Sequence, residues 1–273
     1  MLIRNLLYIL QSENYNTKRF LKFAYSHFRW WDLEKRQKIT WTSKIKLLYL
    51  LACCLLLIAA IAVFALKGFV LFLVVIILEI FFLPIIILLS VFLTKPIDFY
   101  LKNKIIKKAG KFLTDKRVMT IGITGSYGKT STKEILHAIL SEHFSVLKTP
   151  ENINTDIGIA NFILQNLKNE KILIAEMGAH YPEDIKKICK FTKPNYSILT
   201  GINESHLERF GNIGNTIKEK FSLLENTEKF SSLNFDDVNI KENYTKFKFP
   251  AFGGFSKNNA TRVEFINDFG GIR

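Results

Sequence analysis

The stretch Val118-Met-Thr-Ile-Gly-Ile-Thr-Gly-Ser-Tyr-Gly-Lys-Thr-Ser131 decides the fold of the second half of the chain. A short apolar run from 118 to 123 predicts a buried strand, and the loop after it leads into a segment with helical periodicity. Glycines let backbone amides turn toward phosphate oxygens, and the helix N-terminus adds its positive dipole. The stretch therefore predicts a phosphate-binding loop.

In such a loop Lys129 would reach the β- and γ-phosphates of ATP, and the Thr130 hydroxyl would hold Mg²⁺. The match to the usual spacing is imperfect, because Ile123 stands where the first glycine is expected. A plain glycine-rich turn is the alternative, and the flanking strand and helix argue against it. The residues expected to bind the nucleotide are Thr124, Gly125, Ser126, Tyr127, Gly128, Lys129, Thr130 and Ser131.

Outward from this loop, short apolar runs alternate with segments of helical period. We expect strands at 118–123, 145–147, 171–175 and 195–199, and helices at 129–142, 156–167, 182–191 and 213–228. This order predicts an α/β domain with a parallel sheet, whose ligands gather beyond the carboxyl ends of the strands. The tail from 246 to 273 shows no clear completed element.

Two candidate metal ligands follow expected strands. Glu176 comes directly after the third strand, where a carboxylate beside the loop is an expected partner of Mg²⁺, with a surface carboxylate or helix cap as the alternative. His206 follows the fourth strand. On local grounds it is as well explained by packing or surface exposure as by metal binding.

The first third of the chain has a different character. The apolar runs 47–66 and 69–93 are each long enough to cross the roughly 30 Å hydrocarbon layer of a membrane as a helix. Only Lys67 and Gly68 separate them, which predicts a tight transmembrane hairpin and excludes a wholly soluble protein. Glu79 lies within the second run, where a carboxylate is expected to be protonated or to face a partner.

The charge distribution predicts the orientation of this hairpin. The chain carries 38 Lys and Arg against 24 Asp and Glu, a net charge of +14, and basic residues flank the hairpin on both sides. The positive-inside rule then places both termini and the ATP site in the cytoplasm, with the chain a multi-pass protein of the inner (cytoplasmic) membrane. The expected parts are a basic arm (1–46), the hairpin (47–93), a basic linker (94–117) and the nucleotide-binding domain (118–273).

Within the arm, residues 20–31 mix aromatic and basic side chains. This pattern is typical of an amphipathic helix lying on an anionic lipid bilayer, and nucleic acid is the rival partner for it. The bilayer is favoured because the hairpin already holds this segment against lipid head groups, so no nucleic-acid partner is expected.

Taken together, four motifs in order resemble the Mur ligase family. They are Thr-Gly-Ser-Tyr-Gly-Lys-Thr-Ser (124–131), Glu-Asn-Ile-Asn-Thr-Asp-Ile-Gly (151–158), Glu-Met-Gly-Ala (176–179), and His-Leu-Glu-Arg-Phe-Gly with Ile-Lys-Glu-Lys (206–211, 217–220). The resemblance implies the central ATP-binding domain of an ATP-dependent amide ligase acting through an acyl phosphate. It also implies peptidoglycan precursor synthesis, with a dipeptide or amino acid added to a UDP-linked muramoyl peptide.

Carried over by position, the resemblance assigns roles to particular residues. Lys129 would neutralise the transferring phosphoryl group, Thr130 and Glu176 would hold a first Mg²⁺, and His206 a second. Lys220 stands where the family has a carbamoylated lysine that bridges to metal, against the alternative of an ordinary surface lysine. The remaining matches are Asn152 and Asn154 near the substrate, and Asn234 with Asp236 or Asp237 on the adenine side.

The chain also departs from the family pattern. A basic arm and hairpin occupy the place of the uridine-binding domain, and the chain stops at Arg273 before the central sheet is expected to be complete. We expect a fragment of a longer product; a partner chain that supplies the missing C-terminal domain, or loss of catalysis, are the alternatives. In function, a membrane-associated poly-γ-glutamate synthase-like ligase and a non-catalytic nucleotide-binding scaffold remain open.

Overall fold

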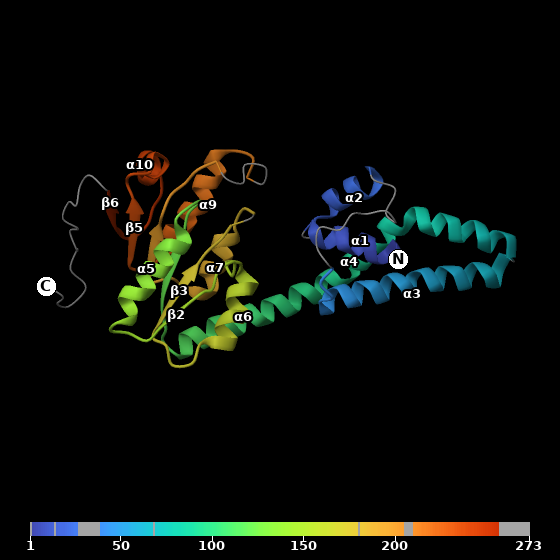
Figure 1. Ribbon diagram of the computed structural model, residues 1–273, viewed down its shortest axis with the longest axis horizontal. Coiled ribbons are helices and arrows are strands. Elements are labelled where there is room, and N and C mark those ends of the chain that lie inside the picture. The colour runs from blue at the N-terminus through green and yellow to red at the C-terminus, as the bar shows by residue number, and fades with distance from the viewer. Residues whose placement is uncertain are drawn as a thin grey trace. The chain divides into compact units, whose positions relative to one another are not determined.

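The computed structural model describes residues 2–13, 15–26, 39–67, 69–179, 181–204 and 210–256, without the side chains of 62–67, 69–77 and 79–80. The chain forms two compact units, Met1–Tyr100 and Leu101–Arg273 (Figure 1). The boundary between the units therefore lies inside 94–117, the segment expected as a linker. This segment is not an extended linker, since most of it belongs to a helix that ends at Asp115.

The first unit is helical. Its elements are α1 (Leu2–Ser12), α2 (Thr17–Ser26), α3 (Ser43–Lys67) and the first part of α4 (Phe69–Asp115). All four contribute to one buried apolar cluster, which includes Leu6 of α1, Phe20 of α2, Leu48 of α3 and Ile87 of α4. The segment expected as an amphipathic helix, 20–31, overlaps α2 as far as Ser26, and its remainder lies outside the described residues.

Two described stretches of these helices, Ser43–Ile61 and Phe81–Asp115, are long and apolar enough to cross a membrane by length and composition. The expected runs 47–66 and 69–93 fall within α3 and α4. Pro84 does not end α4, which also continues through Pro96. The side chain of Glu79 lies outside the description.

The second unit is built on a six-stranded sheet of order β2-β3-β1-β4-β5-β6, in which every pair is parallel. This arrangement confirms the expected parallel α/β fold. Its strands are β1 (Met119–Thr124), β2 (Val146–Lys148), β3 (Ile172–Glu176), β4 (Tyr196–Leu199), β5 (Phe230–Asn234) and β6 (Ala251–Phe255). Its helices are α5 (Lys129–Ser141), α6 (Asp156–Asn166), α7 (Asp184–Thr192), α9 (Ile213–Glu225), α10 (Val238–Asn243) and the short 3-10 helix η2 (Tyr244–Lys246).

Alternate residues of the central strands face opposite layers. Ile123 and Ile174 pack with Leu136 and Leu140 of α5 on one face of the sheet. Leu173 and its neighbours on the other face join a larger cluster formed with α6, α7, α9 and the end of α4. From β1 the chain builds β2 and β3 on one side and β4 to β6 on the other. The direction in which strands are added to the sheet thus changes at β1, and in parallel α/β sheets ligands bind at such a point, beyond the carboxyl ends of the strands.

Two expectations need correction. The tail contains a strand, since β6 pairs with β5 at the sheet edge beside α10 (Figure 1). In addition, α7 starts at Asp184, not at Pro182, because Glu183 just before it has φ of 68°, which is not a helical conformation.

Candidate nucleotide-binding site

The loop between β1 and α5 has the backbone shape of a phosphate cradle. Gly125 has φ of +157°, and a Cβ there would lie 2.0 Å from Oγ1 of Thr200. Gly128 precedes α5 with φ of 76°, and no side chain caps the helix. The first amides of a helix have no partner within the helix. The expected loop residues therefore present the start of α5 to an anion, as a phosphate site requires.

Lys129 folds over this loop. Its ammonium donates hydrogen bonds to the carbonyl oxygens of Gly125 at 2.8 Å and Ser126 at 3.4 Å. Burial lowers the pKa of Lys129, and the negative charge of Glu176 opposes that shift. The lysine is thus held above the cradle, where it can meet phosphate oxygens.

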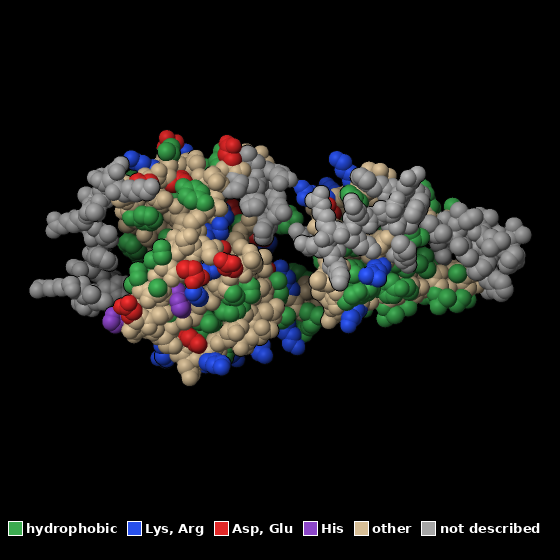
Figure 2. Space-filling view, viewed as in Figure 1, with side chains coloured by type: hydrophobic (Ala, Val, Ile, Leu, Met, Phe, Trp, Pro, Cys, Tyr) green, Lys and Arg blue, Asp and Glu red, His purple; other side chains and the backbone are tan. Residues whose placement is uncertain are grey.

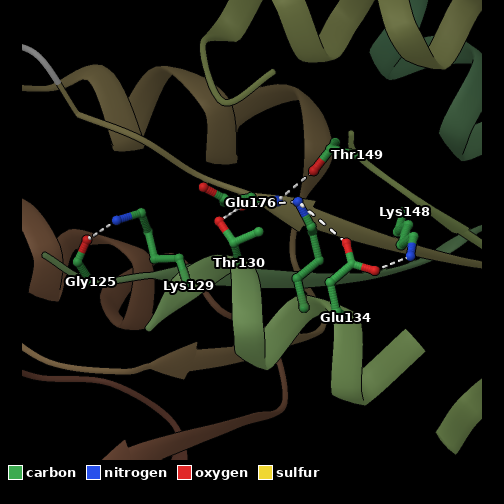
Figure 3. A network of polar contacts seen from close by, with 8 residues as sticks. Gly125, Lys129, Thr130, Glu134, Lys148, Thr149 and Glu176 are labelled. Atoms are coloured by element: carbon green, nitrogen blue, oxygen red, sulfur yellow. Dashed lines mark hydrogen bonds and ion pairs between the residues drawn. The ribbon is translucent and has the colours of Figure 1, made fainter. Parts of the chain in front are cut away.

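The two residues expected to hold the first Mg²⁺ are in contact. The Thr130 hydroxyl donates to Oε2 of Glu176 at 3.0 Å, and the Glu176 amide donates to Oγ1 of Thr149 at 3.0 Å (Figure 3). A hydroxyl and a carboxylate that converge at a phosphate loop are the oxygen ligands that Mg²⁺ prefers. This donor set fits a magnesium ion bound together with nucleotide.

Sequence reasoning missed Lys133, which also binds Glu176. Its ammonium donates to Oε2 of Glu176 at 3.0 Å, and its side chain is 0% exposed. The sequence signal that could have indicated this role is the position of Lys133 on α5, three residues after Thr130 and four after Lys129. Side chains at these spacings share one face of a helix.

Lys220 lies deep in the second unit, with only 5% of its surface exposed. The pKa of Lys220 is lowered to about 8, chiefly by burial and also by the positive charge of Lys129, while the negative charge of Glu219 opposes the shift. The fold therefore brings Lys220 within electrostatic range of Lys129 in the phosphate loop, and its expected role as a carbamoylated metal ligand stays a prediction. No described residue accepts a hydrogen bond from its ammonium.

Glu219, the residue before Lys220, has a separate structural task. Its two carboxylate oxygens accept hydrogen bonds from the amides of Glu183 at 2.6 Å and Ile185 at 2.8 Å. A carboxylate at a helix N-terminus satisfies unpaired amides and the helix dipole. Glu219 therefore joins α9 to the start of α7.

The second metal ligand predicted from the sequence, His206, lies outside the described residues. Within the described part of the chain, no group of three or more His, Cys, Asp or Glu side chains could hold a metal ion. The role of His206 stays a prediction.

The residues expected on the adenine side form a connected network. Asn234 donates from Nδ2 to the Thr200 carbonyl at 2.9 Å and accepts from the Asp236 amide at 3.1 Å, so its side chain joins the ends of β4 and β5. Asp237 accepts the Tyr127 hydroxyl at 2.7 Å, which raises the pKa of Tyr127 to about 12. The phosphate loop is thereby tied to the start of α10.

The two expected substrate-binding asparagines differ in setting. Asn154 packs against Gly178 after β3: its carbonyl accepts the Gly178 amide at 2.9 Å, and a Cβ on Gly178 would lie 2.6 Å from Cγ of Asn154. Asn152 is exposed and has φ of 65°. Asn154 therefore lies beside the strand end that carries Glu176, and no contact with a described residue places Asn152 there.

The fold and the loop define a P-loop nucleotide-binding domain of the α/β class. Residues 123–269, more than half of the chain, match the Mur ligase middle domain. The chain belongs to the Mur ligase family.

Named relatives support this membership. Over 104 residues the chain is 40% identical to the UDP-N-acetylmuramoyl-tripeptide–D-alanyl-D-alanine ligase of Buchnera aphidicola, covering 38% of this chain and 23% of that protein. Over 129 residues it is 35% identical to the ligase of the same name from Borreliella burgdorferi, covering 46% and 28%. The chain thus spans about a quarter of the length of these curated relatives.

A solved structure agrees with them. The MurF ligase of Thermotoga maritima in complex with ADP superposes with a TM-score of 0.54 at 32% identity, covering 58% of this chain and 37% of that one.

Proposed function

We propose that this chain forms the nucleotide site of an ATP-dependent amide ligase of peptidoglycan precursor synthesis. The substrates would be a UDP-linked muramoyl tripeptide and D-alanyl-D-alanine, as the names of the two curated relatives state for those proteins. An ADP complex of a structural relative supports the nucleotide. The expected Mg²⁺ dependence rests on the contact between Thr130 and Glu176.

In such a reaction ATP supplies a phosphoryl group to the substrate carboxylate, and the incoming amine then displaces phosphate from the acyl phosphate. Phosphoryl transfer needs mainly positioning and neutralisation of charge. In this chain the start of α5 would orient the phosphates, Lys129 would neutralise their charge, and Thr130 with Glu176 would hold Mg²⁺.

The observation that carries the proposal is the setting of Lys220. A P-loop alone is shared by many nucleotide-binding proteins, but a buried lysine with a pKa of about 8 that interacts electrostatically with the loop lysine is not a general part of that loop. Near neutral pH a fraction of such lysines is uncharged. The amine nitrogen can then attack CO₂ and release a proton, forming a carbamate anion whose charge would offset that of Lys129 and suit a second Mg²⁺.

The test is nucleotide binding by the full chain in detergent micelles, measured with a fluorescent ATP analogue with and without Mg²⁺. Saturable binding that needs Lys129 is expected, and a chain that binds no nucleotide would refute the proposal. Phosphate release would then be measured with the muramoyl tripeptide plus D-alanyl-D-alanine, and with glutamate. Release with glutamate alone would favour a poly-γ-glutamate synthase-like ligase. Nucleotide binding without phosphate release on any substrate, even when the part of the relatives that this chain does not span is supplied, would favour a non-catalytic scaffold.

We also propose that α3 and the first part of α4 anchor the chain as a hairpin in the cytoplasmic membrane. Many large apolar side chains of these helices are exposed, and Figure 2 shows them crowded over the described part of α3. The exposed set includes Leu50, Leu57, Ile58, Ile85 and Phe92. Contiguous apolar surface of this kind is typical of contact with lipid or with a partner.

Basic side chains on both flanks of the hairpin support cytoplasmic termini and a cytoplasmic ATP site. Alkaline extraction of membranes from expressing cells should leave the chain in the pellet. Protease added to sealed cells should leave the second unit intact. Release by alkali would refute the anchor, and digestion from outside would refute the orientation.

A further inference from the structure

Lys133 is a charged side chain in an unusual environment. It is 0% exposed, and lysine is almost never fully buried unless it is paired. Its partner is Oε2 of Glu176 at 3.0 Å; a second carboxylate, Glu134, lies 3.9 Å away. Glu134 is itself half exposed and paired with Lys148 on the surface (Figure 3). Glu176 is therefore the principal counter-ion of Lys133.

The charge of Glu176 is in turn stabilised by Lys133. The carboxylate is buried, with 4% of the residue exposed, and an unpaired buried charge is strongly unfavourable. Two donors, Thr130 and Lys133, converge on its Oε2. The charge of Glu176 is thus neutralised by a protein side chain, and Oε1 accepts no hydrogen bond from the described residues.

A divalent cation bound by Thr130 and Glu176 would share this carboxylate with the Lys133 ammonium. Like charges held a few ångströms apart in a poorly solvated site repel one another strongly. Magnesium alone would have to overcome that repulsion with a single carboxylate. Magnesium carried on the phosphates of a nucleotide brings its own compensating anions.

We propose that Lys133 is the resident counter-ion of Glu176, which keeps the site folded without metal and makes it accept Mg²⁺ only together with nucleotide. This inference rests on the proposed function for its metal and nucleotide. Lys133 is a positioning residue, since it acts through Glu176 and not on the substrate.

The test compares variants of the full chain by calorimetric unfolding in detergent micelles. Lys133→Met keeps the length of the side chain and removes its charge. In EDTA its unfolding midpoint should lie below that of the wild type. Magnesium chloride without nucleotide should raise the midpoint of the variant and leave the wild type nearly unchanged, with an apparent Mg²⁺ affinity at least about tenfold tighter in the variant. Lys148→Met, which removes a surface lysine near the same helix, is the matched control and should behave as the wild type.

The double variant Lys133→Met/Glu176→Gln removes both charges. In EDTA its unfolding midpoint should be higher than that of Lys133→Met and close to that of the wild type, because no buried charge is left unpaired. Magnesium chloride should no longer raise the midpoint, because the carboxylate that would bind the metal is gone. If Lys133→Met cannot be purified without metal, a folded double variant supports the proposal and an unfolded one overturns it.

Equal midpoints of wild type and Lys133→Met in EDTA, or an equal gain from magnesium chloride alone, would overturn the role of Lys133. None of these measurements uses nucleotide. Failure of the wild type to bind ATP in the separate binding assay would therefore refute the proposed function without being confused with this result.

Discussion

Replacing Lys220 by methionine removes a buried ammonium and leaves a flexible apolar side chain of similar length. The pKa of Lys220 is lowered from an ordinary 10.5 to about 8. At about 1.4 kcal/mol per unit, this depression corresponds to a cost of about 3 kcal/mol in the free energy of unfolding. Near neutral pH we therefore expect Lys220→Met to have a free energy of unfolding about 3 kcal/mol higher than that of wild-type protein in which Lys220 is not carbamoylated.

The sign of the pH dependence follows from the two pKa values. Below pH 8 both the folded and the unfolded lysine carry the proton, so the cost is complete. Between about 8 and 10.5 the folded side chain loses its proton first, so the wild type gains stability as the pH rises. The advantage of Lys220→Met should shrink over this interval and be largest near neutral pH.

Hydrogen exchange is a suitable assay, because all three tryptophans lie at or before residue 41 and report only on the first unit. The slowest amides of β1 and β3 should exchange about a hundredfold more slowly in Lys220→Met than in the wild type near pH 7, in buffer depleted of CO₂. Lys218→Met, an exposed position on the same helix, is the control. Equal exchange in wild type and Lys220→Met, or a gap that persists with rising pH, would refute the reasoning.

Three further predictions address the loop and the core. Lys129→Ala should weaken Mg²⁺-dependent ATP binding at least about tenfold, because a charge-assisted contact to phosphate is lost; fluorescence titration measures it. Phe221→Ala should lower the free energy of unfolding by about 3 to 5 kcal/mol, since this side chain is fully buried; calorimetry measures the loss. Gly201→Ala places a Cβ 2.2 Å from the ring of Tyr127, so the hydrogen bond to Asp237 should break and the pKa of Tyr127 should fall from about 12 toward 10.0, as followed by NMR of ring-labelled tyrosine.

Matched substitutions control these experiments. Lys148→Ala should leave ATP binding intact, and Phe252→Ala, at an exposed position, should cost much less stability than Phe221→Ala. Tyr127→Phe should abolish the titration assigned to Tyr127. An unchanged titration in Gly201→Ala would contradict the packing of Tyr127 against Gly201.

The elements around the phosphate loop could be predicted because their signals are local. Four strands and four helices were expected within a few residues of their observed bounds, since each is a short apolar run or a helical period closed by turn residues. The last two strands of the sheet, β5 and β6, were not expected, and β6 was missed for a physical reason. In β6, Gly253 and Gly254 resemble a loop, and only the fold shows that the ring of Phe235 fills the space a side chain at Gly254 would need.

In the candidate site, too, residues in local motifs could be predicted, and residues whose roles depend on distant partners could not. Lys129 and Thr130 lie in a contiguous motif, and Glu176 was found because it ends a strand that neighbours β1. Lys133 could not be assigned from its helix position alone, because its role depends on a partner 43 residues away. Asn234 was expected on the adenine side, which stays a prediction; within the protein its side-chain amide bonds two backbone groups, a pairing that the sequence alone did not indicate.

The adjacent pair Glu219 and Lys220 also limits how α9 can change in evolution. Consecutive residues of a helix point about 100° apart, so Glu219 reaches the start of α7 while Lys220 is directed elsewhere in the buried interior. Inserting or deleting one residue upstream in α9 would rotate Glu219 away from the amides of α7 and Lys220 out of its buried position. Homologous chains should therefore tolerate length changes in the loops around α9 but none within the helix before Lys220, and a one-residue deletion scan would show a sharp boundary there.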